Sequence, residues 1–311
     1  MSKIKSFLRG RLSAVQTERA KIIYEGFSDL YQTFRHRPIY PISIEELRLT
    51  LEGMQVSRGD VVLVHSSVSH LFKGSLVRLN PPIENMLTYA SSIVAMLLDL
   101  LGPEGTLLMN TDSIKNIFLF TSQNQVFDYR RSPSRRGLIS EIFRRRNDVL
   151  RSVHPWYNIA GCGKWAKELI SDHEKSTPYA MDKHSPWFKL QEMNAKVLLL
   201  GSGFEANSPI HVVEYVHPEE FPRPIYLNRP LEVRYVGNDQ EVHEMPLMIH
   251  APLWKPGQET RFAYYLQEKY GFYKIKALRD TEIISYPAKA QYEAILNEAR
   301  NNITWYDPVF W

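Results

Sequence analysis

The stretch from Gly201 to Glu214 places an imidazole and a carboxylate at a spacing that suits acid–base chemistry. His211 and Glu214 are three positions apart, so on a helix they share one face. A carboxylate beside an imidazole holds one tautomer and raises the basicity of the ring, which is what a general base requires. The spacing alone fits an ordinary surface pair even better, because such pairs stabilise many helices slightly. The role of this pair therefore depends on what surrounds it.

Two further histidines occupy positions that often carry catalytic residues, one after a predicted strand and one in a loop. His65 follows an apolar run, and His154 precedes Pro155 after a basic segment, so each belongs to a catalytic loop or to a plain turn. No three histidines have metal-ligand spacing and no HExxH motif occurs, so we expect no metal. The other histidines are expected on the surface or in the core: His36, His70, His173, His184, His217, His243 and His250.

Serines and arginines precede a helical segment at Ser132–Gly137, a combination that binds anions at a helix N-terminus or simply caps the helix. Arginines cluster at 130–136 and 144–146, and the net charge is +4. A small anionic ligand explains these clusters better than nucleic acid does, because no zinc-finger, helix-turn-helix or RNA-binding strand pattern is present. The single cysteine, Cys162, excludes an internal disulfide and is expected to be a partly buried thiol.

The start of the chain is polar and basic, without the apolar segment of a secretory signal. The longest apolar run, at 93–101, is too short to cross a bilayer. We therefore expect a cytoplasmic protein that binds no membrane.

The elements that must position these residues follow an α/β pattern. Short apolar runs at 61–64, 106–109 and 196–200 predict strands buried on both faces. Helices are predicted at 83–101, 137–146, 165–173, 258–270 and 288–301, with a capped helix from Ser43 and another from about Ser208. Residues 231–250 predict an antiparallel hairpin laid against the main sheet.

The predicted fold is thus a central mixed sheet flanked by helices, with an antiparallel hairpin insertion and an extra N-terminal helix. Residues 1–40 form the helical extension and residues 41–311 the main domain. Ligands of such sheets bind where strands end and helices begin. Here the strand ends carry His65-Ser-Ser67, Asn110-Thr-Asp112 and Gly201-Ser-Gly203. The last is not GxGxxG, so its glycines indicate a tight turn more than a dinucleotide site.

In order and spacing, several segments together resemble the aminoglycoside N3-acetyltransferase-like, or antibiotic N-acetyltransferase, family. The resemblance runs from about Leu47 to Tyr215. Its pieces are His65–Ser69, Leu101–Met109, Phe127–Asp128, Ser132–Gly137, Phe143–Arg146, Arg151–Pro155, His184–Trp187, Lys196–Gly203 and Asn207–Glu214. No single piece is decisive, but their shared order favours a site at His211 over a surface pair.

The resemblance implies acyl transfer from acetyl-CoA, or another acyl-CoA, to a primary amine of an amino sugar, without a metal. His211 is the implied general base, assisted by Glu214 or Glu205, and His154 is a further catalytic candidate. The implied coenzyme A contacts are His65, Ser66, Ser67, Val68, Thr111, Ser132, Ser134, Arg135 and Arg136. The implied acceptor contacts are Tyr157, Asn158, Asn207 and Ser208. Direct attack is expected, with backbone N–H groups near Ser66–Val68 or Gly203 stabilising the oxyanion.

The chain departs from the family beside the implied acceptor pocket. Tyr157 and Asn158 replace a histidine and a serine, Glu205 replaces a shorter acid, and Ser208 replaces a threonine. Trp156, Tyr157, Trp187 and Trp254 are candidates for a sugar platform or for core. We therefore expect an amino sugar, for example a nucleotide-linked one, before a true aminoglycoside. A catalytically inactive relative that binds coenzyme A or sugar is the alternative, and a homodimer is possible through the N-terminal helix.

Overall fold

The computed structural model describes residues 41–72, 83–222, 224–253 and 255–310. The chain divides into two units, residues 1–41 with 72–82 and residues 42–71 with 83–311. The predicted N-terminal helical extension, residues 1–40, lies outside the described residues, as does Trp254. All of the described helices and strands belong to the second unit.

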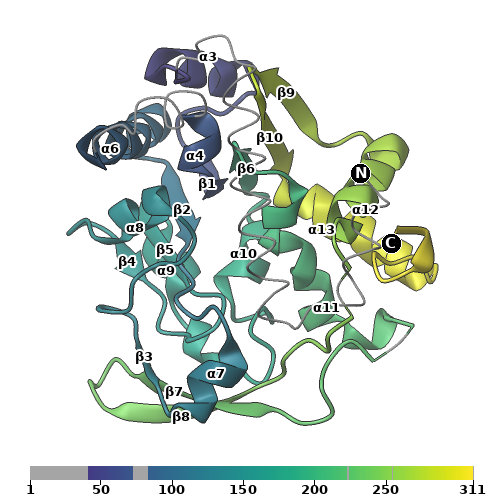
Figure 1. Cartoon of the computed structure of the whole chain (residues 1–311). Coiled ribbons are helices and arrows are strands. Elements are labelled where there is room, and N and C mark those ends of the chain that lie inside the picture. The colour runs from purple at the N-terminus through teal and green to yellow at the C-terminus, as the bar shows by residue number, and fades with distance from the viewer. Residues whose placement is uncertain (1–40, 73–82, 223, 254, 311) are drawn as a thin grey trace, which may run out of the picture. The chain divides into compact units, whose positions relative to one another are not determined.

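A seven-stranded mixed sheet forms the centre of this unit, in the order β4-β5-β2-β1-β6-β10-β9 (Figure 1). Its strands are β1 (Val61–Ser66), β2 (Thr106–Asn110), β4 (Leu150–Arg151), β5 (Ile159–Gly163), β6 (Lys196–Leu200), β9 (Lys274–Leu278) and β10 (Thr281–Pro287). The three predicted strands β2, β1 and β6 are adjacent and parallel, and all others pair antiparallel. The predicted mixed α/β sheet is confirmed, and its parallel strands end along one edge.

Successive side chains of the central strands enter two different cores. Leu63 and Leu108 belong to one core, whereas Val62 and Val64 belong to the other. The second core is covered by α3 (Ile44–Gly53), α6 (Ile83–Leu101) and α8 (Leu138–Arg144). The first is covered by α9 (Ala166–Ile170), α10 (Pro186–Glu192), α11 (Val212–Val216), α12 (Gln258–Tyr270) and α13 (Ala288–Arg300). Burial on both faces explains why these strands read as continuous apolar runs.

The predicted hairpin exists but does not pair with the main sheet. Strands β7 (Leu231–Val236) and β8 (Val242–Leu247) form a separate sheet with β3 (Val126–Asp128). This sheet packs with α7 (Ile117–Ser122) over its own small core, which includes Val233 and Met245 (Figure 1). The hairpin pairs instead with β3, which lies along β7. A strand of only three residues has too little sequence pattern to be predicted, so this partner was missed.

The remaining described elements are short. They are α4 (Val68–Leu71) and the 3₁₀ helices His173–Lys175, Phe204–Ala206, Ser208–His211, Pro218–Glu220 and Pro308–Phe310. Gly201 ends β6 with a φ of 67°, and a Cβ there would meet the Leu71 side chain and the Ser67 carbonyl. The predicted tight turn with close backbone approach is thus confirmed. Among the helices of the described ranges, none combines the length and apolar character needed to span a bilayer.

Candidate active site

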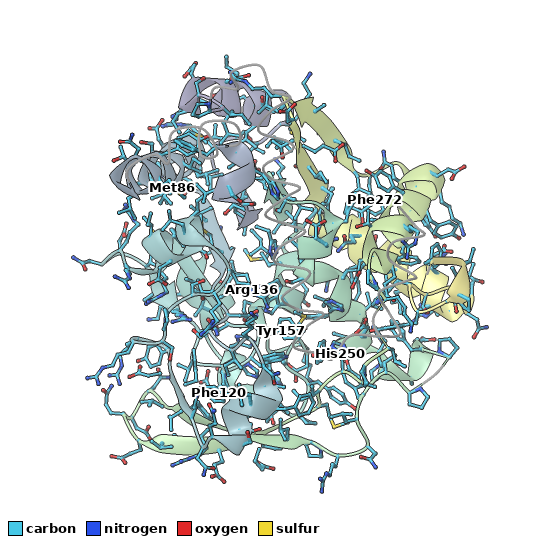
Figure 2. The ribbon with its side chains drawn as sticks, in the orientation of Figure 1. Met86, Phe120, Arg136, Tyr157, His250 and Phe272 are labelled. Carbon is cyan, nitrogen blue, oxygen red and sulfur yellow. The ribbon has the colours of Figure 1, made fainter. Side chains whose placement is uncertain are left out.

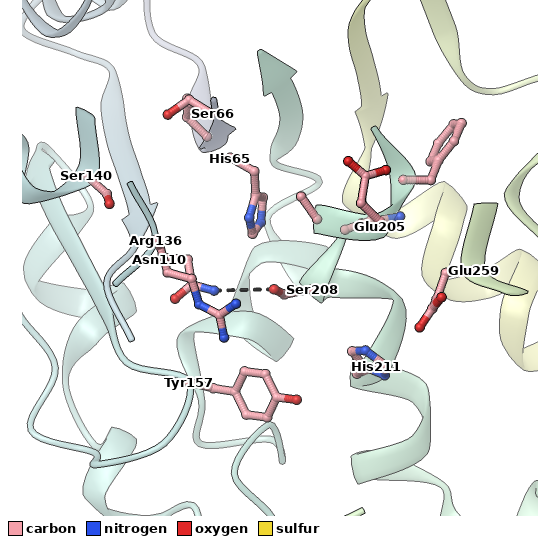
Figure 3. Close-up of a pocket in the computed structure, with 14 residues that line it drawn as sticks. His65, Ser66, Asn110, Arg136, Ser140, Tyr157, Glu205, Ser208, His211 and Glu259 are labelled. Carbon is pink, nitrogen blue, oxygen red and sulfur yellow. Dashed lines mark hydrogen bonds between the residues drawn. The ribbon is translucent and has the colours of Figure 1, made fainter. Parts of the chain in front are cut away.

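A polar pocket opens where β1, β2 and β6 end, which is where an α/β sheet is expected to bind its ligand. Its lining comes from the ends of β1 and β2, the segment after β6, the start of α8 and the first turn of α12. The polar side chains in it are His65, Ser66, Asn110, Arg136, Ser140, Tyr157, Glu205, Asn207, Ser208, His211 and Glu259 (Figure 3). The strand-end prediction therefore located the pocket.

His211 and Glu214 meet at the wall of this pocket. His211 ends the 3₁₀ helix Ser208–His211, and Glu214 lies in the short helix α11 that follows. The Nδ1 atom of His211 lies 3.2 Å from Oε1 of Glu214, whose side chain is fully buried. The segment is not the single regular helix expected from Ser208, yet the spacing still brings the two groups together. His211 lines the pocket, so the pair is not a plain surface pair.

Charge and burial act in opposite directions on this pair. Burial opposes the charged form of both groups, but the Glu214 carboxylate outweighs it at His211 and raises the pKa of that imidazole above its usual value. Burial likewise acts to raise the pKa of Glu214, but His250 and His211 outweigh it and lower that pKa to about 2. The carboxylate is therefore charged at neutral pH, and His211 is more basic than a free imidazole.

Glu214 has two further partners that the sequence did not single out. His250 contacts Oε2 through its Nε2 atom, and the Tyr306 hydroxyl donates to Oε1 at 2.9 Å. The ligand atoms of His211, Glu214 and His250 lie within 4.8 Å of one another, so these three are the described residues best placed to hold a metal. Here the same atoms bond to each other, which satisfies the buried carboxylate without a metal.

The opposite wall of the pocket carries Arg136 (Figure 3). Its Nε and Nη2 atoms donate to Oδ2 of the buried Asp112, at 3.0 and 2.6 Å. No group among the described residues accepts from Nη1, and the Arg136 side chain lines the pocket. Beside it, Asn110 donates to the Ser208 hydroxyl at 3.3 Å. The buried Nε2 of His65 also has no partner among the described residues.

Two carboxylates complete the pocket. Glu205 accepts a hydrogen bond from the Gly203 backbone N–H at 2.9 Å, so it contacts the turn and not His211. Glu259, which the sequence analysis missed, is 7% exposed and lines the pocket near His211 (Figure 3). Within the described chain, no hydrogen bond or ion pair engages its carboxylate. In the sequence, Glu259 could be noticed only as an acidic residue in the first turn of the helix predicted at 258–270.

Of the predicted acceptor contacts, three line the pocket. They are Tyr157, Asn207 and Ser208. Asn207 is fixed by Gln291, to which its Nδ2 atom donates at 2.7 Å. Tyr157 takes a positive φ of 58° and packs edge-on against Trp187, which is buried core and not a sugar platform.

Asn158 and Thr111 do not reach the pocket, because both are fully buried around Arg151. Arg151 donates to the Asn158 side chain at 2.9 Å and to the Thr111 hydroxyl at 3.1 Å. It also donates to the carbonyls of Tyr129 and Ser132, at 3.0 and 2.6 Å. Burial lowers the pKa of Arg151 to about 9, so it stays charged at neutral pH. This network orders the loops behind the pocket.

The predicted anion-binding segment Ser132–Gly137 is divided between two places. Arg136 lines the pocket, whereas Ser132 and Arg135 line a separate hollow beside α7. The Ser134 hydroxyl pairs with Ser140 at 2.9 Å, and its N–H donates to Glu141 at 2.7 Å. Ser134 is therefore bound to the first turn of α8, although the N-cap residue of that helix, Gly137, makes no side-chain capping hydrogen bond.

Most arginines of the basic clusters form ion pairs, two of them sharing each of two carboxylates. Arg130 and Arg131 pair with Asp128, while Arg144 and Arg145 pair with Glu141. Arg146 likewise pairs with Asp148.

At the end of β1, His65 and Ser66 line the pocket, and Ser67 and Val68 do not. The Ser67 N–H donates to the Leu200 carbonyl at 2.9 Å. Since the Gly203 N–H is held by Glu205, two of the backbone donors expected for an oxyanion are already engaged. Burial and the nearby Arg136 lower the pKa of His65 to about 3, so this imidazole is neutral.

His154 is buried away from the pocket. Its ring stacks on His173 with centroids 4.4 Å apart, and Nε2 lies 3.1 Å from the Ser176 carbonyl. The Trp156 N–H donates to Nδ1 at 3.1 Å. Burial lowers the pKa of His154 to about 4. Both nitrogens of this neutral ring are therefore occupied, and the structure does not bring it to His211.

We expect His154→Ala to destabilise the fold and to leave chemistry in the folded protein nearly unchanged. Removing the ring leaves a cavity beside His173 and an unpaired Ser176 carbonyl, which together cost about 2–4 kcal/mol. Urea unfolding and turnover per folded molecule would be measured on the same preparation. A hundredfold loss of turnover with unchanged stability would instead place His154 in the chemistry.

Cys162 is a half-buried thiol at the end of β5, outside the pocket. Burial raises the pKa of its thiol, and nearby Asp148 does the same. A thiol that resists deprotonation is a poor nucleophile at neutral pH. The half-buried position agrees with the expected partly buried thiol.

A mixed sheet with a polar, acid–base pocket at the ends of its parallel strands defines an α/β enzyme. The chain belongs to the aminoglycoside 3-N-acetyltransferase family, whose model matches residues 63–296. It is therefore an N-acyltransferase by family, and the predicted family and enzyme class are confirmed. Aminoglycoside N(3)-acetyltransferase IV from Salmonella sp is 31% identical over 201 residues, which cover 62% of this chain and 69% of that protein.

Solved structures with the same fold include complexes. The AAC-IIIb binary structure with CoASH has a TM-score of 0.67 at 19% identity, covering 84% of this chain and 97% of that one. A variant of AAC(3)-IVa in complex with a gentamicin has a TM-score of 0.67 at 23% identity, covering 86% and 92%. At these identities the likeness establishes the fold.

Proposed function

We propose that this protein transfers an acyl group from an acyl-CoA to a primary amine of an amino sugar, with His211 as the general base. The observation that carries the proposal is the pairing of His211 with the buried, charged Glu214 at the wall of the pocket. A neutral imidazole of raised basicity is what removes a proton from an ammonium near neutral pH. The complexes of related folds with CoASH and with a gentamicin support the two substrates.

The proposed step is direct. Nε2 of His211 takes a proton from the acceptor ammonium, and the amine nitrogen attacks the thioester carbon. The carbon–sulfur bond then breaks, and the departing thiolate takes up the proton that His211 carries. The freed Nε2 removes the second proton from the attacking nitrogen, now part of the amide, and releases it to water. Arg136 offers its unpaired Nη1 N–H to the oxyanion, supported by its ion pair with Asp112. Since backbone donors at Ser67 and Gly203 are engaged, this guanidinium is the stronger candidate.

Glu259 is proposed to bind the acceptor ammonium next to His211. A nearly buried carboxylate without a partner is costly unless a ligand cation pairs with it. It is 7% exposed and lies in the same pocket as the proposed base. Arg136 on the opposite wall is a permanent cation and repels an ammonium. The amine of the acceptor is therefore favoured at the Glu259 side of the pocket.

We expect Glu259→Gln to raise the KM for the amine roughly tenfold or more, because a charge-assisted hydrogen bond to the ammonium is lost. The free energy of unfolding should stay the same or increase slightly, since an unpaired buried carboxylate is removed. Glu268→Gln on the exposed face of the same helix is the matched control. An unchanged KM for every accepted amine would remove Glu259 from acceptor binding.

Release of free thiol tests the proposal, with acetyl-CoA and longer acyl-CoA esters as donors. The acceptor panel would contain aminoglycosides, simple amino sugars and nucleotide-linked amino sugars. Thiol release that depends on both donor and amine is the expected result. A protein that binds coenzyme A yet releases no thiol with any acceptor would be the inactive relative, and the proposed function would fail.

A further inference from the structure

His250 contacts the carboxylate of Glu214 but has no role in the proposed reaction step. His250, labelled in Figure 2, follows β8 and forms a β-bridge with Tyr226, whereas His211 ends the 3₁₀ helix Ser208–His211. The Leu227 N–H donates to the Ile249 carbonyl at 2.9 Å, and the Ala251 N–H donates to the Ile225 carbonyl at 2.8 Å. The backbone on both sides of His250 is therefore fixed.

The ring of His250 is held as firmly as its backbone. It stacks on Tyr226, with centroids 5.1 Å apart and planes 17° apart, and meets Tyr215 edge-on at 5.1 Å. Its Nε2 atom contacts Oε2 of Glu214. The ring centroids of His250 and His211 are 5.3 Å apart, so the two imidazoles lie on either side of one carboxylate.

The contacts divide the two oxygens of Glu214 between different partners. Oε1 accepts from Tyr306 at 2.9 Å and lies 3.2 Å from Nδ1 of His211, while among the described residues Oε2 contacts only His250. The terminal torsion of a glutamate is broad, so a carboxylate held at one oxygen can still rotate. A donor on the second oxygen fixes the plane. That orientation keeps the proton of His211 on Nδ1 and leaves Nε2 free to act as the base.

We propose that His250 is a positioning residue for acyl transfer: it holds the second oxygen of Glu214 and thereby orients His211 toward the substrates. The inference rests on the proposed role of His211. It assigns no contact between His250 and substrate, because His250 does not line the pocket.

The described rings that contact His250 are those of His211, Tyr215 and Tyr226, and its Nε2 atom contacts Glu214. Tyr306 donates to the same carboxylate, and Tyr157 packs on Tyr215. Burial raises the pKa of Tyr157, and it raises those of Tyr215, Tyr226 and Tyr306 well above the usual value. The tyrosines therefore stay neutral near pH 7. Changes in the acidic limb of the pH–rate profile then report on His211 and Glu214.

The test compares three variants in the full-length protein: His250→Ala, His250→Gln and His243→Ala. The glutamine amide places an N–H near the position of Nε2, whereas alanine removes the donor. His243 belongs to β8 and pairs with Asp239 at the hairpin, so its variant is the matched control. Thiol release would be measured against amine concentration and pH, and unfolding by urea.

For His250→Ala we expect kcat to fall about tenfold with little change in KM, because orientation and not binding is lost. His250→Gln should recover most of kcat. The acidic limb of the His250→Gln profile should also shift, because the group that helps to lower the pKa of the Glu214 carboxylate has gone. The His243 variant should match the wild type.

Two outcomes would overturn the proposal. In the first, both His250 variants turn over like the wild type, or lose stability equally with an unmoved pH profile, which is what a merely structural residue gives. In the second, chelation abolishes wild-type turnover and zinc alone restores it, so that His250 acts as a metal ligand. A His211→Ala variant measured alongside separates the two failures: if it is active, the proposed function itself fails.

Discussion

His211→Ala is expected to lower acyl transfer by about 10²–10⁴-fold, the usual contribution of a positioned general base. The imidazole is the described group at the pocket wall that combines a carboxylate partner with a free ring nitrogen. Without it the amine must lose its proton to water before it attacks the thioester. The measurement is kcat/KM for the amine, from thiol release at a fixed acyl-CoA concentration.

The loss of activity in His211→Ala should come from the missing base and not from a less stable fold. The side chain of His211 is 21% exposed, so its removal opens no large cavity in the core. The variant should unfold at nearly the same urea concentration as the wild type and should still bind coenzyme A. At high pH, where more free amine exists in solution, the difference in rate should narrow. Activity within threefold of the wild type at neutral pH would show that another group is the base.

Glu214→Gln is expected to have the second largest effect, through both rate and pH dependence. The carboxylate raises the pKa of His211, so its neutral replacement lets that pKa fall. His211 acts when deprotonated, and therefore the acidic limb of the pH–rate profile should move to lower pH. The maximal rate should fall at least tenfold, because the amide neither fixes the tautomer nor stabilises the imidazolium. A profile that keeps its wild-type position would separate Glu214 from the base.

The same residue links stability to pH. A carboxyl whose pKa falls from 4.5 to about 2 on folding contributes about 3 kcal/mol above pH 4.5. That contribution is lost as the pH falls from about 4.5 toward 2. His211 has the opposite sign, because its raised pKa stabilises the fold below pH 6.5 and less as the pH rises. The free energies of unfolding of wild type and Glu214→Gln, measured with urea, should therefore differ most between pH 4.5 and pH 6.5 and should converge in acid.

The buried central strands could be predicted because each strand is apolar on both faces and ends in polar residues. Strands β4, β5, β9 and β10 could not. In β5, Gly161 sits where a Cβ would lie 2.9 Å from Ile170, so packing imposes residues that do not resemble a strand. Strand β9 lies at the edge of the sheet and alternates lysine with small or apolar residues. Its partner, and not its composition, makes it a strand.

Some residues of the site could likewise be predicted from the sequence, and others could not. His211 and Glu214 could be paired because they are neighbours on one local segment. His250, Tyr306 and Glu259 lie far along the chain and meet them only through the fold, so no spacing rule could find them. Conversely, Asn158 and Thr111 carry polar groups that suit a site, but Arg151 binds them in the interior. Sequence shows which side chains could react, and packing decides which ones face the ligand.

The most direct test of the central claim is to follow an isotopically labelled acetyl group from acetyl-CoA by mass spectrometry. Wild-type protein, His211→Ala and the His243→Ala control would each be mixed with donor and an amino-sugar acceptor and then quenched. We predict that the label appears on the acceptor nitrogen with one free thiol per transfer, in wild type and control only, and never on the protein. Label bound covalently to the protein, or equal labelling of the acceptor by His211→Ala, would contradict direct transfer with His211 as the base.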